Sequence, residues 1–302
     1  MFIIRVAKSS ICIKAKTQKL NYIDINMKKF LNWNLWRDAF TVALAILAFV
    51  ETIMAVANIQ LEQIVPISMW YLRLFVILGT LFVIWFITTL IKHLCSKKTI
   101  SLTIRNIPIT IKEGDLFKQA DWKLIPCNEY FDTTVDDIII AHRSLHGMFI
   151  DNYVKDIESL KHAVSNAKKD VIRGLQEKPL SRGRVKFPLG RIIPYQDYML
   201  LALTHFDDEN RAYLTQNDYE ACLRNMWQEI SRVYAKRPIS IPLMGAGITR
   251  FDGAVEKSEE RLLRCILCTL KTSNAQIYEP IQIILDKKTL NKIDLYNFKK
   301  FQ

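Results

Sequence analysis

The sequence predicts a two-helix transmembrane hairpin followed by an α/β domain, whose mixed, largely parallel central sheet is flanked by helices. Two long apolar runs lie near the N-terminus, and basic residues flank them. From residue 99 onward, short β patterns alternate with amphipathic helical patterns. Strands that alternate with helices indicate a layered α/β domain, so the chain divides into an anchor and a folded C-terminal part.

The second apolar run is the stronger membrane candidate. Residues 74–91 are eighteen residues without a charge, and at about 1.5 Å per residue they cover most of a hydrocarbon core of roughly 30 Å. The first run, residues 39–57, contains Glu51. Its nine Leu, Ile, Phe and Val residues contribute roughly −3 to −5 kcal/mol to insertion, and a central acid costs about 2.5–3.5 kcal/mol. We therefore expect spans at about 39–58 and 71–91.

Glu51 is expected to face another helix because lipid would not solvate it. One interpretation is a polar seam or pore-lining position in an oligomer. The alternative is a snorkelling or protonated acid without a role.

The excess positive charge is concentrated beside the apolar runs. The chain has 42 Lys and Arg against 30 Asp and Glu, a net charge of +12. Residues 1–38 hold eight bases and two acids (8 − 2 = +6), and residues 92–105 hold four bases and no acid (+4). Since Lys and Arg are retained on the cytoplasmic side, we expect both termini and the C-terminal domain in the cytoplasm. The balanced remainder argues against binding of nucleic acid.

Three regions follow from these patterns. Residues 1–38 form a basic N-terminus, in which 1–26 are interpreted as an over-extended start or a disordered segment and Met27 as an alternative start. Residues 39–91 form the hairpin, and residues 92–302 form a linker and the ligand-binding domain. Cys265 and Cys268 are interpreted as buried core thiols, because no second pair of cysteines accompanies them, and no metal site is expected.

The C-terminal part contains predicted strands and helices in alternation. The strands are predicted over residues 98–111, 122–127, 198–204, 238–243 and 280–286, and the helices over 136–145, 152–176, 216–235 and 256–272. Ligands of such sheets bind at the carboxyl ends of strands. This rule directs attention to the residues that follow Ile111, Cys127 and Leu243.

Each of these exits carries residues suited to a nucleotide. Gly114 and Asp115 follow the first strand, and a carboxylate there can accept hydrogen bonds from an exocyclic amine. Asn128 follows the second and can address ribose hydroxyl groups. Gly245 and Gly247 follow the third, where glycine lets main-chain amide groups approach phosphate oxygens.

Together, these segments resemble the macro domain, an α/β module that binds ADP-ribose, over roughly residues 100–302. The resemblance implies an adenine contact at Asp115 with its neighbour Leu116, a ribose contact at Asn128, and a diphosphate-binding loop that comprises Met244, Gly245, Ala246, Gly247 and Ile248.

The loop after Asn128 departs from the macro pattern. Macro domains usually have a glycine-rich first loop there, and this chain has an acidic segment instead. Its Thr133, Thr134 and the amide of Val135 are candidates to hold a phosphate at a predicted helix start. The missing glycines disfavour ADP-ribosyl hydrolysis, so no catalytic residue is assigned.

Two membrane spans joined to a divergent macro domain resemble the membrane-anchored macro effectors of Thoeris, a bacterial antiphage system. The resemblance implies a chain in the inner membrane that binds an ADP-ribose-derived signal made from NAD by a TIR-domain partner. Binding then promotes self-association, membrane disruption and cell death. A histidine or imidazole conjugate of ADP-ribose would suit the acidic loop. The alternatives are a membrane-tethered scaffold that binds ADP-ribose and an ADP-ribosyl hydrolase.

Overall fold

The computed structural model describes residues 27, 29–57, 69–95, 99–174, 186–207, 209–247, 249–252, 257–299 and 301. The chain divides into two compact units. The helical unit contains residues 1–98 with Asp294–Asn297, and the α/β unit contains residues 99–293 with 298–302. The predicted properties of residues 1–26 and of the loop between the spans lie outside the described residues.

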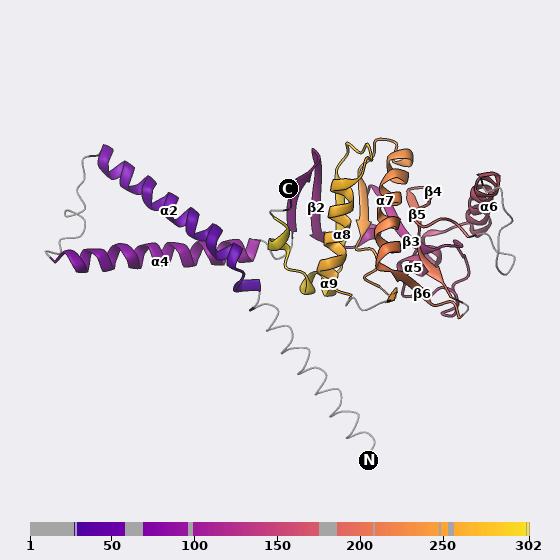
Figure 1. The fold of residues 1–302 in the computed structure, drawn as a ribbon, viewed down its shortest axis with the longest axis horizontal. Helices are drawn as coiled ribbons and strands as arrows, with labels where there is room; N and C mark the ends of the chain where they lie inside the picture. Colours follow the sequence, from indigo (N-terminus) through magenta and orange to yellow (C-terminus); the bar gives the residue numbers. More distant parts are fainter. Residues whose placement is uncertain are drawn as a thin grey trace, which may run out of the picture. The chain divides into compact units, whose positions relative to one another are not determined.

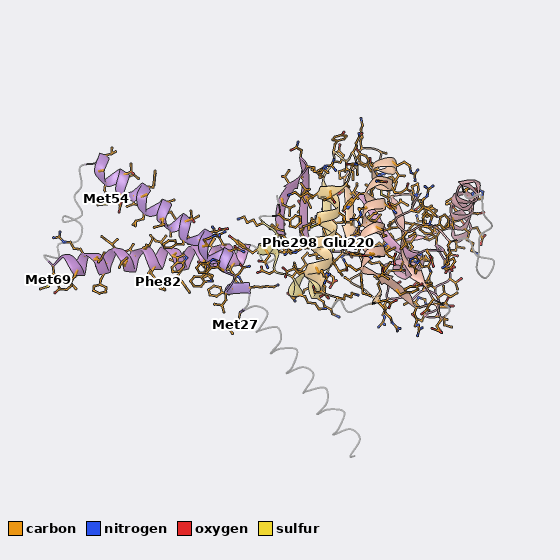
Figure 2. All side chains as sticks on the ribbon, in the orientation of Figure 1. Met27, Met54, Met69, Phe82, Glu220 and Phe298 are labelled. Carbon is orange, nitrogen blue, oxygen red and sulfur yellow. The ribbon has the colours of Figure 1, made fainter. Side chains whose placement is uncertain are left out.

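The helical unit contains two long apolar helices, α2 (Trp33–Val56) and α4 (Trp70–Cys95) (Figure 1). The most apolar 18-residue stretches of Trp33–Val56 and Tyr71–Leu94 have mean hydropathies of 2.3 and 2.6, and only 11% and 6% of these stretches are buried. Figure 2 shows their side chains projecting outward, among them the 55% exposed Phe82. By length and composition, both helices could cross a membrane.

The two helices pack against each other along the first half of α2. Leu35, Ala39 and Ala43 are buried there, and the Trp85 indole N–H donates to the Trp36 carbonyl at 2.9 Å. The small side chains at positions 39 and 43 allow close approach. Glu51 lies beyond this contact and is exposed, so its role in an oligomer seam stays a prediction.

The segment Asp294–Asn297 belongs to the helical unit. The side-chain oxygen of Asn32 caps α2 by accepting from the main-chain amide of Asn34. The side-chain nitrogen of Asn32 donates to the carboxylate of Asp294 at 2.6 Å. The Tyr296 hydroxyl donates to the Asp38 carboxylate at 2.8 Å. The C-terminal part of the chain thus supplies polar partners to the start of α2.

The α/β unit contains one mixed sheet with the strand order β1-β2-β9-β7-β3-β5-β6-β8, and β4 pairs with β5. The strands are β1 (Thr99–Ile104), β2 (Ile107–Glu113), β3 (Trp122–Asn128), β4 (Ile192–Tyr195), β5 (Tyr198–Phe206), β6 (Ala212–Thr215), β7 (Ile239–Pro242), β8 (Arg250–Asp252) and β9 (Ile281–Leu285). The central strands β2, β9, β7, β3 and β5 are parallel, which confirms the predicted architecture.

Helices cover both faces of this sheet. They are α5 (Leu145–Tyr153), α6 (Ile157–Gly174), α7 (Gln216–Val233), α8 (Glu259–Thr272) and α9 (Lys287–Lys292), with a short 3-10 turn η1 (Leu116–Lys118). A second 3-10 turn, η2 (Leu295–Phe298), begins in the segment that belongs to the helical unit. Ile125 and Leu200 form one core cluster with Phe149 of α5 and Leu160 of α6. Because side chains alternate along a strand, Leu124 and Met199 face the opposite side, where α7 and α8 lie side by side (Figure 1).

Several predicted boundaries were wrong. The predicted strand over 98–111 is the hairpin of β1 and β2, since Arg105 and Asn106 have φ values of 51° and 65° and make a tight turn. The predicted helix over 152–176 is interrupted, because α5 ends at Tyr153 and the side chain of Asp156 caps the start of α6.

The predicted helix over 136–145 is instead an irregular loop that ends where α5 begins. The Asp136 carboxylate accepts from the amides of Ile138 and Ile139, and that of Asp137 accepts from His142. Such local bonds compete with helical ones. The prediction for the cysteines was also wrong, because on α8 Cys265 is half-buried and Cys268 is exposed.

Candidate functional site

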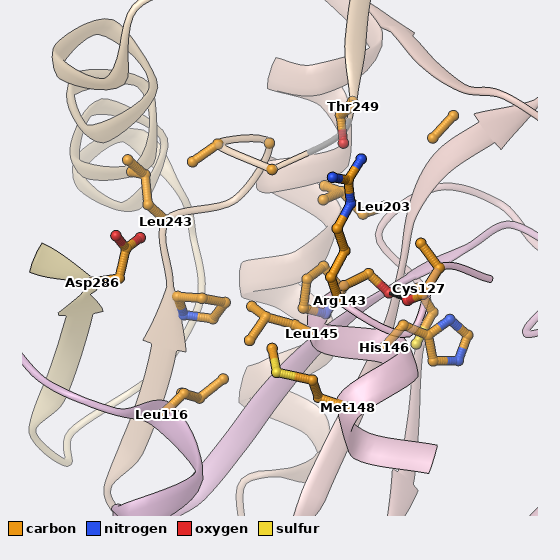
Figure 3. Close-up of a pocket in the computed structure, with 18 of the residues that line it drawn as sticks. Leu116, Cys127, Arg143, Leu145, His146, Met148, Leu203, Leu243, Thr249 and Asp286 are labelled. Carbon is orange, nitrogen blue, oxygen red and sulfur yellow. Dashed lines mark hydrogen bonds between the residues drawn. The ribbon is translucent and has the colours of Figure 1, made fainter. Parts of the chain in front are cut away.

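A cavity of about 750 Å³ opens in the α/β unit at the carboxyl ends of the parallel strands (Figure 3). Its lining comes from the exits of β2, β3, β5, β7 and β9, from α5 and from the loop before α5. The volume lies within the range of about 300–1,000 Å³ that is typical of small-molecule sites.

The loop after β7 presents main-chain amide groups to this cavity. Gly245 has a φ of +76°, and a Cβ there would lie 3.2 Å from the Phe251 ring, so the position requires glycine. Lys257 donates to the carbonyls of Gly247 and Thr249 at 2.9 and 3.0 Å. Within the described part of the chain, the amide groups of Gly245 and Gly247 donate to no protein acceptor. The loop therefore has free donors for an anion.

The exit of β2 forms another wall of the cavity. Asp115 is exposed, and one carboxylate oxygen accepts from the Phe117 amide at 3.0 Å. Its other oxygen has no bonding partner among the described residues. Phe117 stacks on Tyr153 with ring centroids 4.5 Å apart, and Leu116 is buried beside them. This wall combines a free carboxylate oxygen with flat apolar surface.

Asn128 lines the cavity at the exit of β3 and is 3% exposed. Its side-chain oxygen accepts from the amides of Tyr130 and Asp132 at 3.1 and 3.2 Å. Its side-chain nitrogen donates to the Asp132 carboxylate at 3.0 Å. In this structure, Asn128 therefore organises the loop that follows it.

The remaining predicted residues are placed differently. Thr133, Thr134 and Val135 are not part of the cavity lining. Met244 is fully buried, and its carbonyl accepts from the Tyr219 hydroxyl at 3.0 Å. Ile248 lies outside the described residues. The cavity thus brings together six of the eleven predicted ligand residues, namely Asp115, Leu116, Asn128, Gly245, Ala246 and Gly247.

Comparison with known proteins gives the family. The family model described as "Thoeris protein ThsA, Macro domain" matches residues 109–286. The Thoeris protein ThsA of Bacillus amyloliquefaciens (strain Y2) is 37% identical over 214 residues, which are 67% of this chain and 70% of that protein. The chain belongs to the Thoeris ThsA macro-domain family.

Solved macrodomains are similar at low sequence identity. A macrodomain of Oceanobacillus iheyensis with ADP has 13% identity and a TM-score of 0.44, over 67% of this chain and 94% of that one. The macrodomain of Thermus aquaticus DarG has 14% identity and a TM-score of 0.34, over 59% and 97%.

In this ThsA-family chain, a buried carboxylate fixes the base of the first loop. Glu129 is 2% exposed and accepts from Lys186 at 2.9 Å, His205 at 2.8 Å and the Phe206 amide at 3.3 Å. Burial raises the pKa of Glu129, but the hydrogen bonds from His205 and Lys186 outweigh it and hold the pKa below its usual value. The loop is thereby tied to the exit of β5.

Sequence reasoning missed lining residues at the ends of two other strands, including Thr204 near the end of β5 and Asp286 directly after β9. Both strands were predicted, so the strand-exit rule would have found them had it been applied to every strand. Asp286 caps α9 by accepting from the amides of Lys288 and Thr289. Burial raises the pKa of Asp286, but bonds from the Thr289 hydroxyl and these amides lower it overall.

Arg143 and His146 also line the cavity and were missed, because the segment before α5 was predicted as a continuous helix (Figure 3). His146 is 6% exposed, and burial lowers its pKa to about 4. The ring is therefore neutral at neutral pH.

The surroundings of three lining groups define their chemical state. Burial raises the pKa of the Cys127 thiol strongly, which keeps it protonated and unreactive. Asp115 and Asp286 each accept a main-chain amide at a helical turn. In the parts that the structure describes, no group of three or more His, Cys, Asp or Glu could hold a metal ion.

Proposed function

We propose that this chain is a membrane effector of antiphage defence, gated by an ADP-ribose-derived nucleotide that binds in the cavity. The observation that carries the proposal is the cavity itself, in which the acceptor-free amides of Gly245 and Gly247 share one lining with Asp115. Amide donors suit a diphosphate, and a free carboxylate oxygen suits the amine of adenine. Membership of the ThsA macro-domain family supports the same ligand class.

The signal in this proposal is made by a TIR-domain partner after infection. A histidine or imidazole conjugate of ADP-ribose is our candidate. Occupancy promotes self-association of the chain, and the two helices then disrupt the bilayer. A ligand drives such a change only by its higher affinity for the assembled state, typically about 1–3 kcal/mol.

We place the chain in the bacterial inner membrane, with both termini and the α/β unit in the cytoplasm. The support comes from the two apolar helices and from the basic residues beside them. We assign no catalytic step: the lining thiol of Cys127 is buried, and the free oxygen of Asp115 is assigned to the adenine.

The test compares Gly247→Glu with Gly247→Ala in cells that also express the TIR-domain partner. A Cβ at position 247 meets nothing within 4 Å, so both variants should fold and insert. Glutamate places a negative charge beside the diphosphate, and we expect it to abolish nucleotide binding, assembly and loss of membrane potential on infection. Alanine should behave as the parent. If Gly247→Glu kills infected cells as the parent does, gating by this cavity is wrong.

Two further readouts separate the alternatives. A scaffold would bind ADP-ribose without a change in oligomeric state or membrane potential. A hydrolase would release ADP-ribose from modified protein, and we expect no such release.

A further inference from the structure

Most main-chain amide groups of the first loop, residues 129–142, are already engaged. Nine of them donate within the loop or to strand β5. Acceptors inside the loop take the amides of residues 130, 131, 132, 136, 137, 138, 139 and 142, and the Thr204 carbonyl takes that of Glu129. These engaged amide groups are therefore not available to a phosphate.

Arg143 lies where this loop ends. It makes no ion pair or hydrogen bond with any residue that the structure describes. The neighbouring residue in sequence, His142, pairs instead with the Asp151 carboxylate at 2.7 Å. Among the described lining residues, Arg143 is the one with a permanent positive charge. In the view of Figure 3, its side chain extends from the start of α5 toward Thr249 of the loop after β7.

A second polar side chain, that of His146, belongs to the same lining. His146 is only 6% exposed, and its ring has no hydrogen-bond partner among the described residues. A neutral imidazole can donate one hydrogen bond and accept another. An unpaired arginine and an unpartnered buried imidazole in one lining indicate that an anionic, hydrogen-bonding group binds there.

We propose that Arg143 is a ligand-binding residue that contacts the diphosphate of the bound nucleotide, opposite the amides of Gly245 and Gly247. This inference rests on the proposed function, because it assigns one residue to the proposed ligand. Arginine supplies a planar fork of donors and a permanent charge, which replace the amide groups that the first loop uses internally. The negative charge of the ligand is thus balanced by a side chain on one side and by main-chain dipoles on the other.

The test is titration calorimetry of the full chain in detergent with ADP-ribose, ADP and adenosine. We expect Arg143→Ala to weaken ADP-ribose and ADP by the same factor, about 10- to 100-fold, as a lost charge-assisted bond predicts. Adenosine has no phosphate, so its affinity should not change. Arg143→Lys keeps the charge without the fork and should restore part of the loss for both phosphorylated ligands. Binding by the parent should also weaken more steeply with salt than binding by Arg143→Ala.

Arg224→Ala is the matched control, because Arg224 is exposed on α7 and is not part of the lining. Arg143 is exposed and unpaired, so its truncation should leave the melting temperature unchanged. If the parent binds ADP-ribose and Arg143→Ala binds it equally well, the inference is wrong and the proposed function stands. If only ADP-ribose is weakened and ADP is not, Arg143 contacts a group beyond the diphosphate, which also overturns the inference. If the parent binds none of these ligands, both proposals fail.

Discussion

Replacement of Glu129 by glutamine should destabilise the α/β unit measurably. The carboxylate is 2% exposed and accepts three hydrogen bonds, two of them from the side chains of Lys186 and His205. A hydrogen bond to a charged group contributes about 1.5–3 kcal/mol. The bond from Lys186 contributes less, nearer about 0.5 kcal/mol, because that side chain is 41% exposed and water screens it. Glutamine keeps one acceptor oxygen, so we expect a loss of about 2 kcal/mol.

The assay is thermal unfolding of the full chain in detergent at pH 7. A loss of about 2 kcal/mol lowers the melting temperature of a unit of this size by about 4–8 °C. The folded-state pKa of Glu129 lies below its usual value, so its stabilisation is present above the unfolded pKa of about 4.3 and is lost as the pH falls through the folded pKa. The difference between parent and variant should therefore shrink at pH 3.5.

Glu158→Gln is the matched control, because its pair with Lys161 lies on the surface and its side chain is 74% exposed. It should melt with the parent. Equal melting temperatures for Glu129→Gln and the parent at pH 7 would refute the role assigned to this carboxylate.

Three other changes have defined outcomes. Burial lowers the folded-state pKa of His146 to about 4, and the unfolded value is about 6.5, so the free energy of unfolding should fall as the pH drops from 6.5 to 4. Denaturant titrations of His146→Phe should show no such pH dependence. Gly245→Ala should cost about 1–2 kcal/mol in unfolding free energy, since φ is +76°, and an unchanged denaturation midpoint would argue against strain. Gly147→Ala places a Cβ against the Ala141 carbonyl oxygen, which forces the loop before α5 to shift. The affinity for ADP-ribose should therefore drop, and an unchanged affinity would show that the loop adapts without harm to the site.

Much of the sheet could be predicted because its strands are short apolar runs between breakers. This basis predicts the segments of β3, β5, β7 and β9. Because β2 and β7 both run parallel to β9, the residues that follow them, Asp115 and Gly247, line one cavity. Strand β4 was missed because it has only four residues and pairs locally with β5, and β6 and β8 are as short.

The first loop could not be predicted because its conformation depends on side-chain hydrogen bonds with no periodic signature. Asp136 and Asp137 bond to the amides of their own loop, and Asn128 bonds to those of Tyr130 and Asp132. The same bonds displace the expected helix start and leave Arg143 as the charged residue at that side of the cavity. A helical pattern in the sequence carries no information about such bonds.

The most direct measurement of the central claim is calorimetric titration of ADP-ribose into the full chain in detergent, beside Gly247→Ala and Gly247→Glu. The account predicts saturable binding at one site per chain for the parent and Gly247→Ala, and none for Gly247→Glu. Absence of binding to the parent, or equal binding by Gly247→Glu, would contradict it.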